Sequence, residues 1–177
     1  MEYSHFLLQV GNYTWLAYII AFVAVFKLSL ADRSYCFGAA VLIVSNLIMQ
    51  VVEPGLVALS PYNKELVRQL WYPTWASFAL VSIYAINLLH KKTYCSIGFV
   101  SKSIVYAFCG LGLLQFVRYF DYLVYQTNYF DWLYRYGVNA INIGAVFIML
   151  TPIFAALWRK LKPIPQKLKL LIQKLRT

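Results

Sequence analysis

Long apolar stretches alternate with short polar breaks along this chain. A helix needs about 20 mostly apolar residues to cross the hydrocarbon core of a bilayer. Five stretches come close to that length: residues 13–30, 35–52, 70–89, 97–116 and 138–158. The breaks between them hold charged and turn-forming residues. The pattern predicts an all-α fold, an integral membrane bundle of five transmembrane helices.

The composition supports a membrane protein and changes how the charge is interpreted. Hydrophobic residues make up 62% of the chain and charged residues 12%, against roughly 45–50% and 25% in soluble domains. A net charge of +10 would suggest nucleic acid in a soluble protein, but seven of the sixteen basic residues follow residue 158. We therefore expect anionic membrane lipid on the cytoplasmic side as a partner, and no nucleic acid.

The distribution of basic residues predicts the orientation. Short loops rich in Lys and Arg stay in the cytoplasm, so the basic C-terminus is expected to be cytoplasmic and, with five spans, the N-terminus outside. Twelve basic residues then lie inside and four outside, and the four are Lys64, Arg68, Arg118 and Arg135. The chain is expected in the cell membrane as a multi-pass protein, which means the inner membrane if the source is bacterial.

The end of the chain differs from the rest. We divide the chain into a five-span transmembrane domain, residues 1–158, and a basic amphipathic tail, residues 159–177. Leu168, Leu171, Ile172 and Leu175 form an apolar stripe with helical spacing. Basic side chains flank it, and we expect them to contact lipid at the cytoplasmic surface: Lys167, Lys169, Lys174 and Arg176. A cytoplasmic partner protein on the same face is the alternative.

The segment "QFVRYFDYLVYQTNYFDWLYRYG", residues 115–137, is unusually aromatic. Trp and Tyr rings favour the membrane interface, where the ring is apolar and its edge forms hydrogen bonds. One interpretation is an aromatic belt with an interfacial loop or short helix. The other is a platform that binds a lipid, a peptide or a glycan. The candidate aromatic outer surface consists of Tyr122, Tyr125, Tyr129, Trp132 and Tyr134.

Polar residues recur on three predicted helical faces at similar depth in the outer half of the membrane. Such residues are costly in hydrocarbon, so they usually face other helices or a water-filled cavity. They predict an outer polar pocket formed by Asn46, Gln50, Glu53, Gln115, Arg118, Asp121, Asn139 and Asn142. The alternative is that they only form hydrogen bonds and ion pairs between helices.

Motifs for catalysis or metal binding are not found. Glu53, Arg118 and Asp121 are candidates for acid/base chemistry, but no nucleophile elbow, HExxH or phosphate loop is present. Whether the chain is an enzyme therefore stays open. Three scattered cysteines and two isolated histidines give no metal-ligand spacing, so we expect no metal and no cofactor, and we place His90 in a solvated loop.

These observations favour a small non-enzymatic integral membrane protein. Its role would be that of an accessory, assembly or inhibitory subunit that recognises a partner protein or lipid at its outer face. One alternative is a lipid-linked or lipid-modifying enzyme with an outward-facing polar pocket. A second is an oligomeric transporter or channel. Besides lipid, another membrane protein or a second copy of the chain is an expected partner, because small residues such as Gly38 and Gly144 permit close helix contacts.

Overall fold

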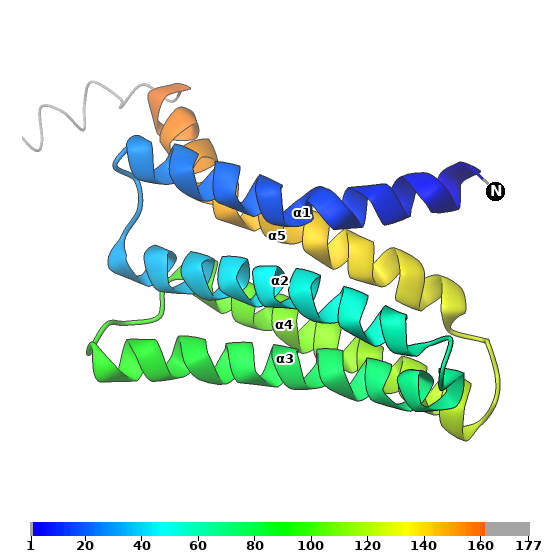
Figure 1. Cartoon of the computed structure of the whole chain (residues 1–177). Coiled ribbons are helices and arrows are strands. Elements are labelled where there is room, and N and C mark those ends of the chain that lie inside the picture. Colours follow the sequence, from blue (N-terminus) through cyan, green and yellow to red (C-terminus); the bar gives the residue numbers. More distant parts are fainter. Residues whose placement is uncertain (1, 162–177) are drawn as a thin grey trace, which may run out of the picture.

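The computed structural model describes residues 2–161, with side chains described from residue 13 onward (Figure 1). Every element within that range is helical, as the sequence pattern predicts. The helices are α1 Glu2–Lys27, α2 Arg33–Leu59, α3 Lys64–Lys92, α4 Phe99–Tyr119, the π-helical turn η1 Phe120–Val124, and α5 Asp131–Leu161. The lipid-contacting tail residues of the sequence analysis, Lys167, Lys169, Lys174 and Arg176, lie outside the described residues.

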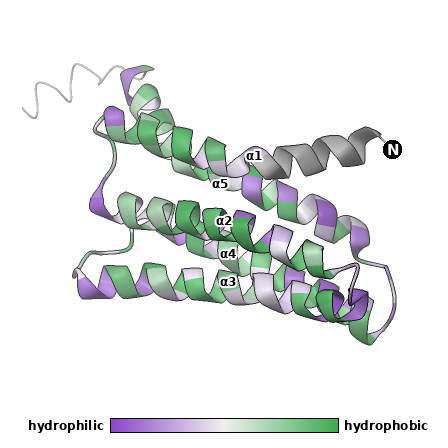
Figure 2. Cartoon of the chain, viewed as in Figure 1, coloured by the Kyte–Doolittle hydropathy of each residue, from purple (hydrophilic) through white to green (hydrophobic). Residues whose placement is uncertain are grey.

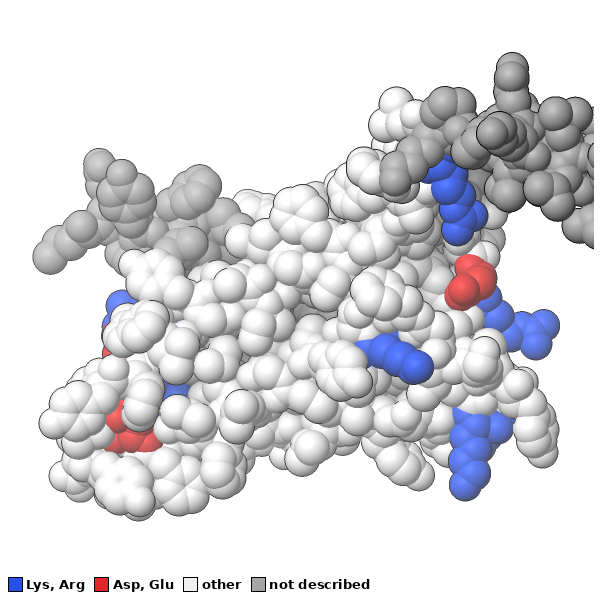
Figure 3. Space-filling view, turned by 180° about the vertical axis from the view of Figure 1, so that it is seen from behind, with Lys and Arg blue, Asp and Glu red and all other residues white. Residues whose placement is uncertain are grey.

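Four of these helices are long and apolar enough to cross a membrane: α2, α3, α4 continued by η1, and α5. The described apolar part of α1, Tyr13–Lys27, is shorter. Hydrophobic residues fill the middle of the helices, and hydrophilic ones are more frequent near the ends (Figure 2). Most charged side chains on the face in Figure 3 also gather toward the two ends. The chain is thus a helical protein with four candidate membrane spans, while the fifth span and the orientation stay predictions.

The helices extend beyond the apolar stretches from which they were predicted. α3 and α5 contain 29 and 31 residues, which at 1.5 Å per residue is roughly 45 Å, against a hydrocarbon core of about 30 Å. Side-chain caps fix two of the starts: Asp32 accepts a hydrogen bond from the Tyr35 N–H, and Asn63 accepts one from the Leu66 N–H. The helix ends therefore reach the polar interface of any bilayer that the bundle spans.

The bundle has α1 packed along α5 on one side and α2, α3 and α4 grouped on the other (Figure 1). α4 joins the two groups because it contacts α2, α3 and α5. Each helix contributes at least one fully buried side chain to the core: Tyr18, Ala39, Ile86, Phe108 and Met149. The loop residues 125–130 connect η1 to α5 at the same end of the bundle as the α2–α3 connection. We call this end the aromatic end.

Gly38 in α2 and Pro152 in α5 are residues that disfavour a helix, and a local contact explains each of them. A Cβ atom added to Gly38 on α2 would lie 2.6 Å from the Ser101 Oγ and 3.1 Å from its Cα, so glycine permits the close approach of α2 and α4. Pro152 cannot donate to the Ile148 carbonyl within α5. The Thr151 hydroxyl donates to that carbonyl instead, at 2.7 Å.

A buried polar cluster joins α2, α3 and α4 at the end opposite the aromatic end. His90 Nδ1 lies 2.7 Å from the Ile86 carbonyl oxygen, and its Nε2 lies 2.8 Å from the Ser34 Oγ. Because a carbonyl only accepts, Nδ1 carries a proton, and Nε2 shares a hydrogen bond with the Ser34 hydroxyl, which also lies 3.2 Å from the Ser101 Oγ. The Ser101 hydroxyl donates to the Ser34 carbonyl at 2.6 Å. With only 3% of His90 exposed, the expectation of a solvated loop histidine is wrong, because α3 continues to Lys92 and turns this side chain inward.

Replacing His90 with leucine should lower the free energy of unfolding by about 1–3 kcal/mol, since the buried Ser34 hydroxyl loses one of its hydrogen-bond partners and the Ile86 carbonyl loses its side-chain donor. Thermal unfolding of the purified protein in detergent measures this change. Asn87→Leu, at an exposed position on the same helix, is the matched control and should shift stability by less than about 0.5 kcal/mol. Equal effects of the two substitutions would contradict a stabilising role for the cluster.

Candidate functional site

The guanidinium of Arg118, in the last turn of α4, lies at the centre of a buried ion-pair network. It donates to Asp121 Oδ2 at 2.7 Å, to Asp131 Oδ1 at 2.8 Å and to Asn128 Oδ1 at 3.0 Å. Only 6% of Arg118 and 4% of Asp121 is exposed. We call these four residues, together with Thr127, the Arg118 cluster. It ties the end of α4 to the start of α5.

The Asp121 carboxylate positions the backbone of the segment that follows η1. Its Oδ1 accepts hydrogen bonds from the Thr127 hydroxyl and, at 3.2 Å, from the Tyr129 N–H. Its Oδ2 accepts from the Phe130 N–H at 3.2 Å. The Thr127 N–H also donates to the Asp121 carbonyl at 2.8 Å. These bonds satisfy the carboxylate and fold residues 127–130 back onto the end of α4.

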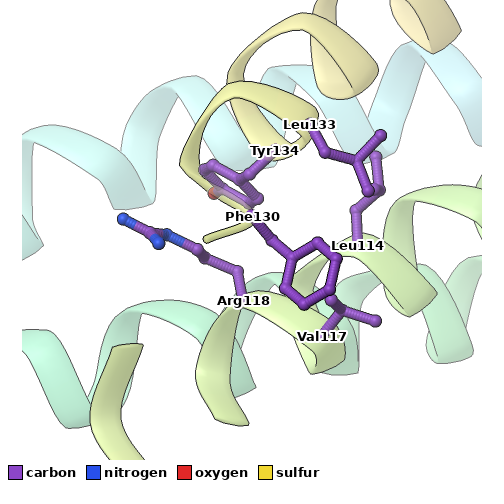
Figure 4. Close-up of a pocket in the computed structure, with 6 residues that line it drawn as sticks. All are labelled: Leu114, Val117, Arg118, Phe130, Leu133 and Tyr134. Carbon is purple, nitrogen blue, oxygen red and sulfur yellow. The ribbon is translucent and has the colours of Figure 1, made fainter. Parts of the chain in front are cut away.

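The ring of Phe130 holds the same segment from its apolar side. Figure 4 shows it beside Arg118 and Val117, with Leu114, Leu133 and Tyr134 completing the surroundings. These side chains pack so closely that the gap between them does not admit a water molecule. Polar bonds on one side and apolar packing on the other therefore fix the segment.

Aromatic rings surround the Arg118 guanidinium. The ring of Tyr122 has the Arg118 Cζ at 4.9 Å from its centroid and the Arg68 Cζ at 5.4 Å, both within cation–π range. The rings of Tyr72 and Tyr134 meet edge to face at 5.8 Å. Aromatic side chains from α3, η1 and α5 thus lie beside Arg118 at the end of α4.

An open depression of about 580 Å³ lies next to this network. Its lining is mostly polar and consists of Tyr72, Arg118, Tyr122, Asn128, Asp131 and Arg135. The Arg135 Nε donates to Asp131 Oδ2 at 2.9 Å. Asp131 therefore bridges a buried arginine and an exposed one.

The structure brings together one of the three predicted polar faces. Arg118 and Asp121 form their ion pair, and nearby Gln115 accepts a hydrogen bond from the Tyr134 hydroxyl at 3.1 Å. The described contacts do not join the other predicted pocket residues to Arg118. Gln50 and Glu53 lie half-buried on α2.

The Asn46 and Asn139 side chains bond within their own helices, whereas at Asn142 it is the backbone carbonyl that is engaged. The Asn46 side chain donates to the Leu42 carbonyl at 3.1 Å, and that of Asn139 donates to the Arg135 carbonyl at 2.9 Å. The Asn142 carbonyl accepts the Tyr18 hydroxyl at 3.0 Å. These contacts are of the kind expected when polar groups only satisfy helices.

The five predicted aromatic surface residues fall into two groups. Tyr125, Tyr129 and Trp132 are 70%, 77% and 63% exposed. Tyr122 and Tyr134 instead lie among the rings around Arg118. We use the name aromatic surface for the exposed rings carried by this segment and the start of α5: Tyr125, Tyr129, Phe130, Trp132 and Tyr136.

Four residues important to the site were not among the predicted ones: Tyr72, Thr127, Asn128 and Asp131. Thr127 and Asn128 lie in a loop, where helical periodicity gives no signal. The sequence does carry a different signal here, because Thr127 and Asn128 are residue types whose side chains commonly form hydrogen bonds with nearby backbone in turns.

Comparisons of this chain with protein-family models, with curated proteins and with solved structures found no match. The function is therefore inferred from the geometry of the site. The Arg118 and Asp121 side chains are engaged by each other and by residues 127–131. The cluster therefore holds residues 127–131 against the end of α4.

Proposed function

We propose that this protein is a non-enzymatic accessory subunit of a membrane assembly, which recognises a partner protein through its aromatic surface. In this proposal the chain crosses the membrane five times and the aromatic end faces outside. The observation that carries it is the attachment of the segment bearing these rings to Asp121 and Arg118.

A backbone that is already fixed favours recognition, because fewer groups then lose conformational freedom on binding. Ordering a flexible side chain at an interface costs about 0.5–1.5 kcal/mol, and Tyr and Trp offer large contact areas with few rotatable bonds. Tyr129 and Trp132 project from a segment that three hydrogen bonds to one carboxylate already hold. An aromatic belt needs its rings only at the right depth, so such attachment is not required for it.

The bundle interior offers less support for the alternatives. The Ser45 and Ser82 hydroxyls lie 2.6 Å apart, and Ser82 also donates to the Phe78 carbonyl. Tyr18 likewise uses its hydroxyl between α1 and α5. These groups satisfy one another between helices, which is typical of packing and gives no continuous polar path for a transported ion. An enzyme would need an acid or base outside the Arg118 cluster, and the remaining candidate, Glu53 on α2, is not joined to Arg118 by the described contacts.

Site-specific photocrosslinking in living cells tests the proposal. A photoreactive phenylalanine analogue in place of Tyr125, Tyr129 or Trp132 should capture one and the same protein. Tyr106 and Tyr94, which are 73% and 98% exposed away from the aromatic surface, are the matched control positions. Replacing Tyr129 and Trp132 with serine should reduce capture from position 125 at least tenfold, since an aromatic anchor at an interface contributes about 2 kcal/mol or more.

Two outcomes would contradict the proposal. Crosslinks from positions 125, 129 and 132 to lipid alone would indicate an aromatic belt. Capture of the same protein from Tyr106 or Tyr94 at equal yield would show that the contact does not depend on the aromatic surface.

A further inference from the structure

We propose that the depression beside the Arg118 cluster binds the headgroup of a zwitterionic phospholipid, a phosphodiester that carries an ammonium group. This inference goes beyond the proposed function and does not depend on a partner protein. The depression lies where the apolar parts of α3, α4 and α5 end (Figure 2). Headgroups are the most concentrated ligands at that level of a bilayer.

The charges around the depression cancel while staying separated in space. Arg118 is paired with buried Asp121, Arg135 with Asp131, and Arg68 with Glu65 at 3.4 Å. The two arginines of the lining are thus balanced by two carboxylates, and Arg68, which lies next to the lining, is balanced by Glu65. A site without net charge gives no general advantage to an anionic lipid, but it offers both signs to a ligand that also carries both.

Two arginines are placed to bind the phosphate. Buried Arg118 already donates to three side chains, so its guanidinium is held in place where it lines the depression. The side chains of Arg135 and Arg68 are 65% and 38% exposed. Arg135 lines the depression, and Arg68 lies next to it, with its Cζ 5.4 Å from the centroid of the Tyr122 ring. Guanidinium groups form paired, charge-assisted hydrogen bonds to phosphate oxygens. The exposed pairs of these arginines with Glu65 and Asp131 contribute little and can rearrange.

The ammonium group has partners on the same lining. The Asp131 side chain is 32% exposed and can accept from it. The ring of Tyr72 also lines the depression, and aromatic rings attract ammonium and quaternary ammonium groups. The two arginines of the lining are balanced by Asp131 and by Asp121 behind it, so the site is complementary to phosphoethanolamine or phosphocholine headgroups.

Native mass spectrometry of the full chain in detergent tests this inference. The protein is titrated with phosphatidylethanolamine, phosphatidylcholine and phosphatidylglycerol of identical acyl chains. Both zwitterionic lipids should bind about tenfold more tightly than phosphatidylglycerol, which corresponds to 1.4 kcal/mol. The variant Arg68→Gln/Arg135→Gln should lose that preference, while Lys91→Gln/Lys92→Gln, which removes the same charge from exposed positions at the opposite end, should keep it.

Three results would overturn the inference. These are equal binding of phosphatidylglycerol by the wild type, an unchanged preference in the arginine variant, and equal loss in the lysine control. Free phosphoethanolamine should displace the lipid only at far higher concentration, and displacement at equal concentration would identify a soluble phosphoester as the ligand instead. Thermal unfolding confirms that the arginine variant is folded, and Arg135→Gln alone replaces it if it is not.

Discussion

Arg118→Ala is expected to lower the free energy of unfolding by roughly 3–5 kcal/mol, because it leaves the buried Asp121 carboxylate without its cation. The same change should release residues 127–130 from the end of α4, since Asn128 and Asp131 lose their common donor. Thermal unfolding in detergent measures the first effect. Faster proteolytic cleavage within residues 125–130 measures the second.

Two variants separate the buried charge from general disturbance. Arg118→Gln/Asp121→Asn removes both charges at once and should destabilise the protein less than Arg118→Ala, although function should still be lost. Arg135→Ala breaks only a partly exposed pair with Asp131 and should cost about 0–1 kcal/mol. If Arg118→Ala and Arg135→Ala proved equally mild, the cluster would not organise the aromatic end.

The second large effect is expected at the contact between α2 and α4. Gly38→Val should destabilise the protein by about 1–3 kcal/mol, because its Cβ alone would lie 2.6 Å from the Ser101 Oγ and 3.1 Å from the Ser101 Cα. Moving the helices apart would also strain the hydrogen bond from Ser101 to the Ser34 carbonyl. Thermal unfolding in detergent is again the measurement.

Gly144→Val is the matched control for that substitution. It makes the same chemical change in a helix, but nothing lies within 4 Å of a Cβ at this position. The change in the free energy of unfolding should therefore reflect only the difference in helix preference between valine and glycine. That difference is small in the apolar part of a bundle. A loss of stability at Gly144 equal to that at Gly38 would argue against a close helix contact at Gly38.

Helical periodicity predicted the parts of the molecule that depend on near neighbours in the sequence. It left breaks at residues 31–34, 53–69 and 90–96, which contain or adjoin the observed helix ends, and it set Arg118 and Asp121 one turn apart. Periodicity did not predict the full length of the helices: α5 begins at Asp131, inside the aromatic segment. Polar residues continue a helix as readily as apolar ones once it reaches the interface, so hydropathy does not mark that boundary.

Contacts that close over a loop could not be predicted in the same way. Asp131 reaches Arg118 across thirteen positions because η1 and residues 125–130 reverse the chain, and no period describes that turn. His90 was misplaced for a related reason: two lysines follow it and suggest a loop. Its neighbours Ser34 and Ser101 come from helices distant in sequence.

The hydrogen bonds to Asp121 fix the backbone of the loop independently of which side chains the loop carries. At positions 129 and 130 the carboxylate accepts from backbone N–H groups, which every residue except proline provides. The side chain at position 129 can therefore change without altering the scaffold. Related chains with the same Arg, Asp and Thr could display different rings on one frame, so that the partner would vary during divergence while the fold stayed constant.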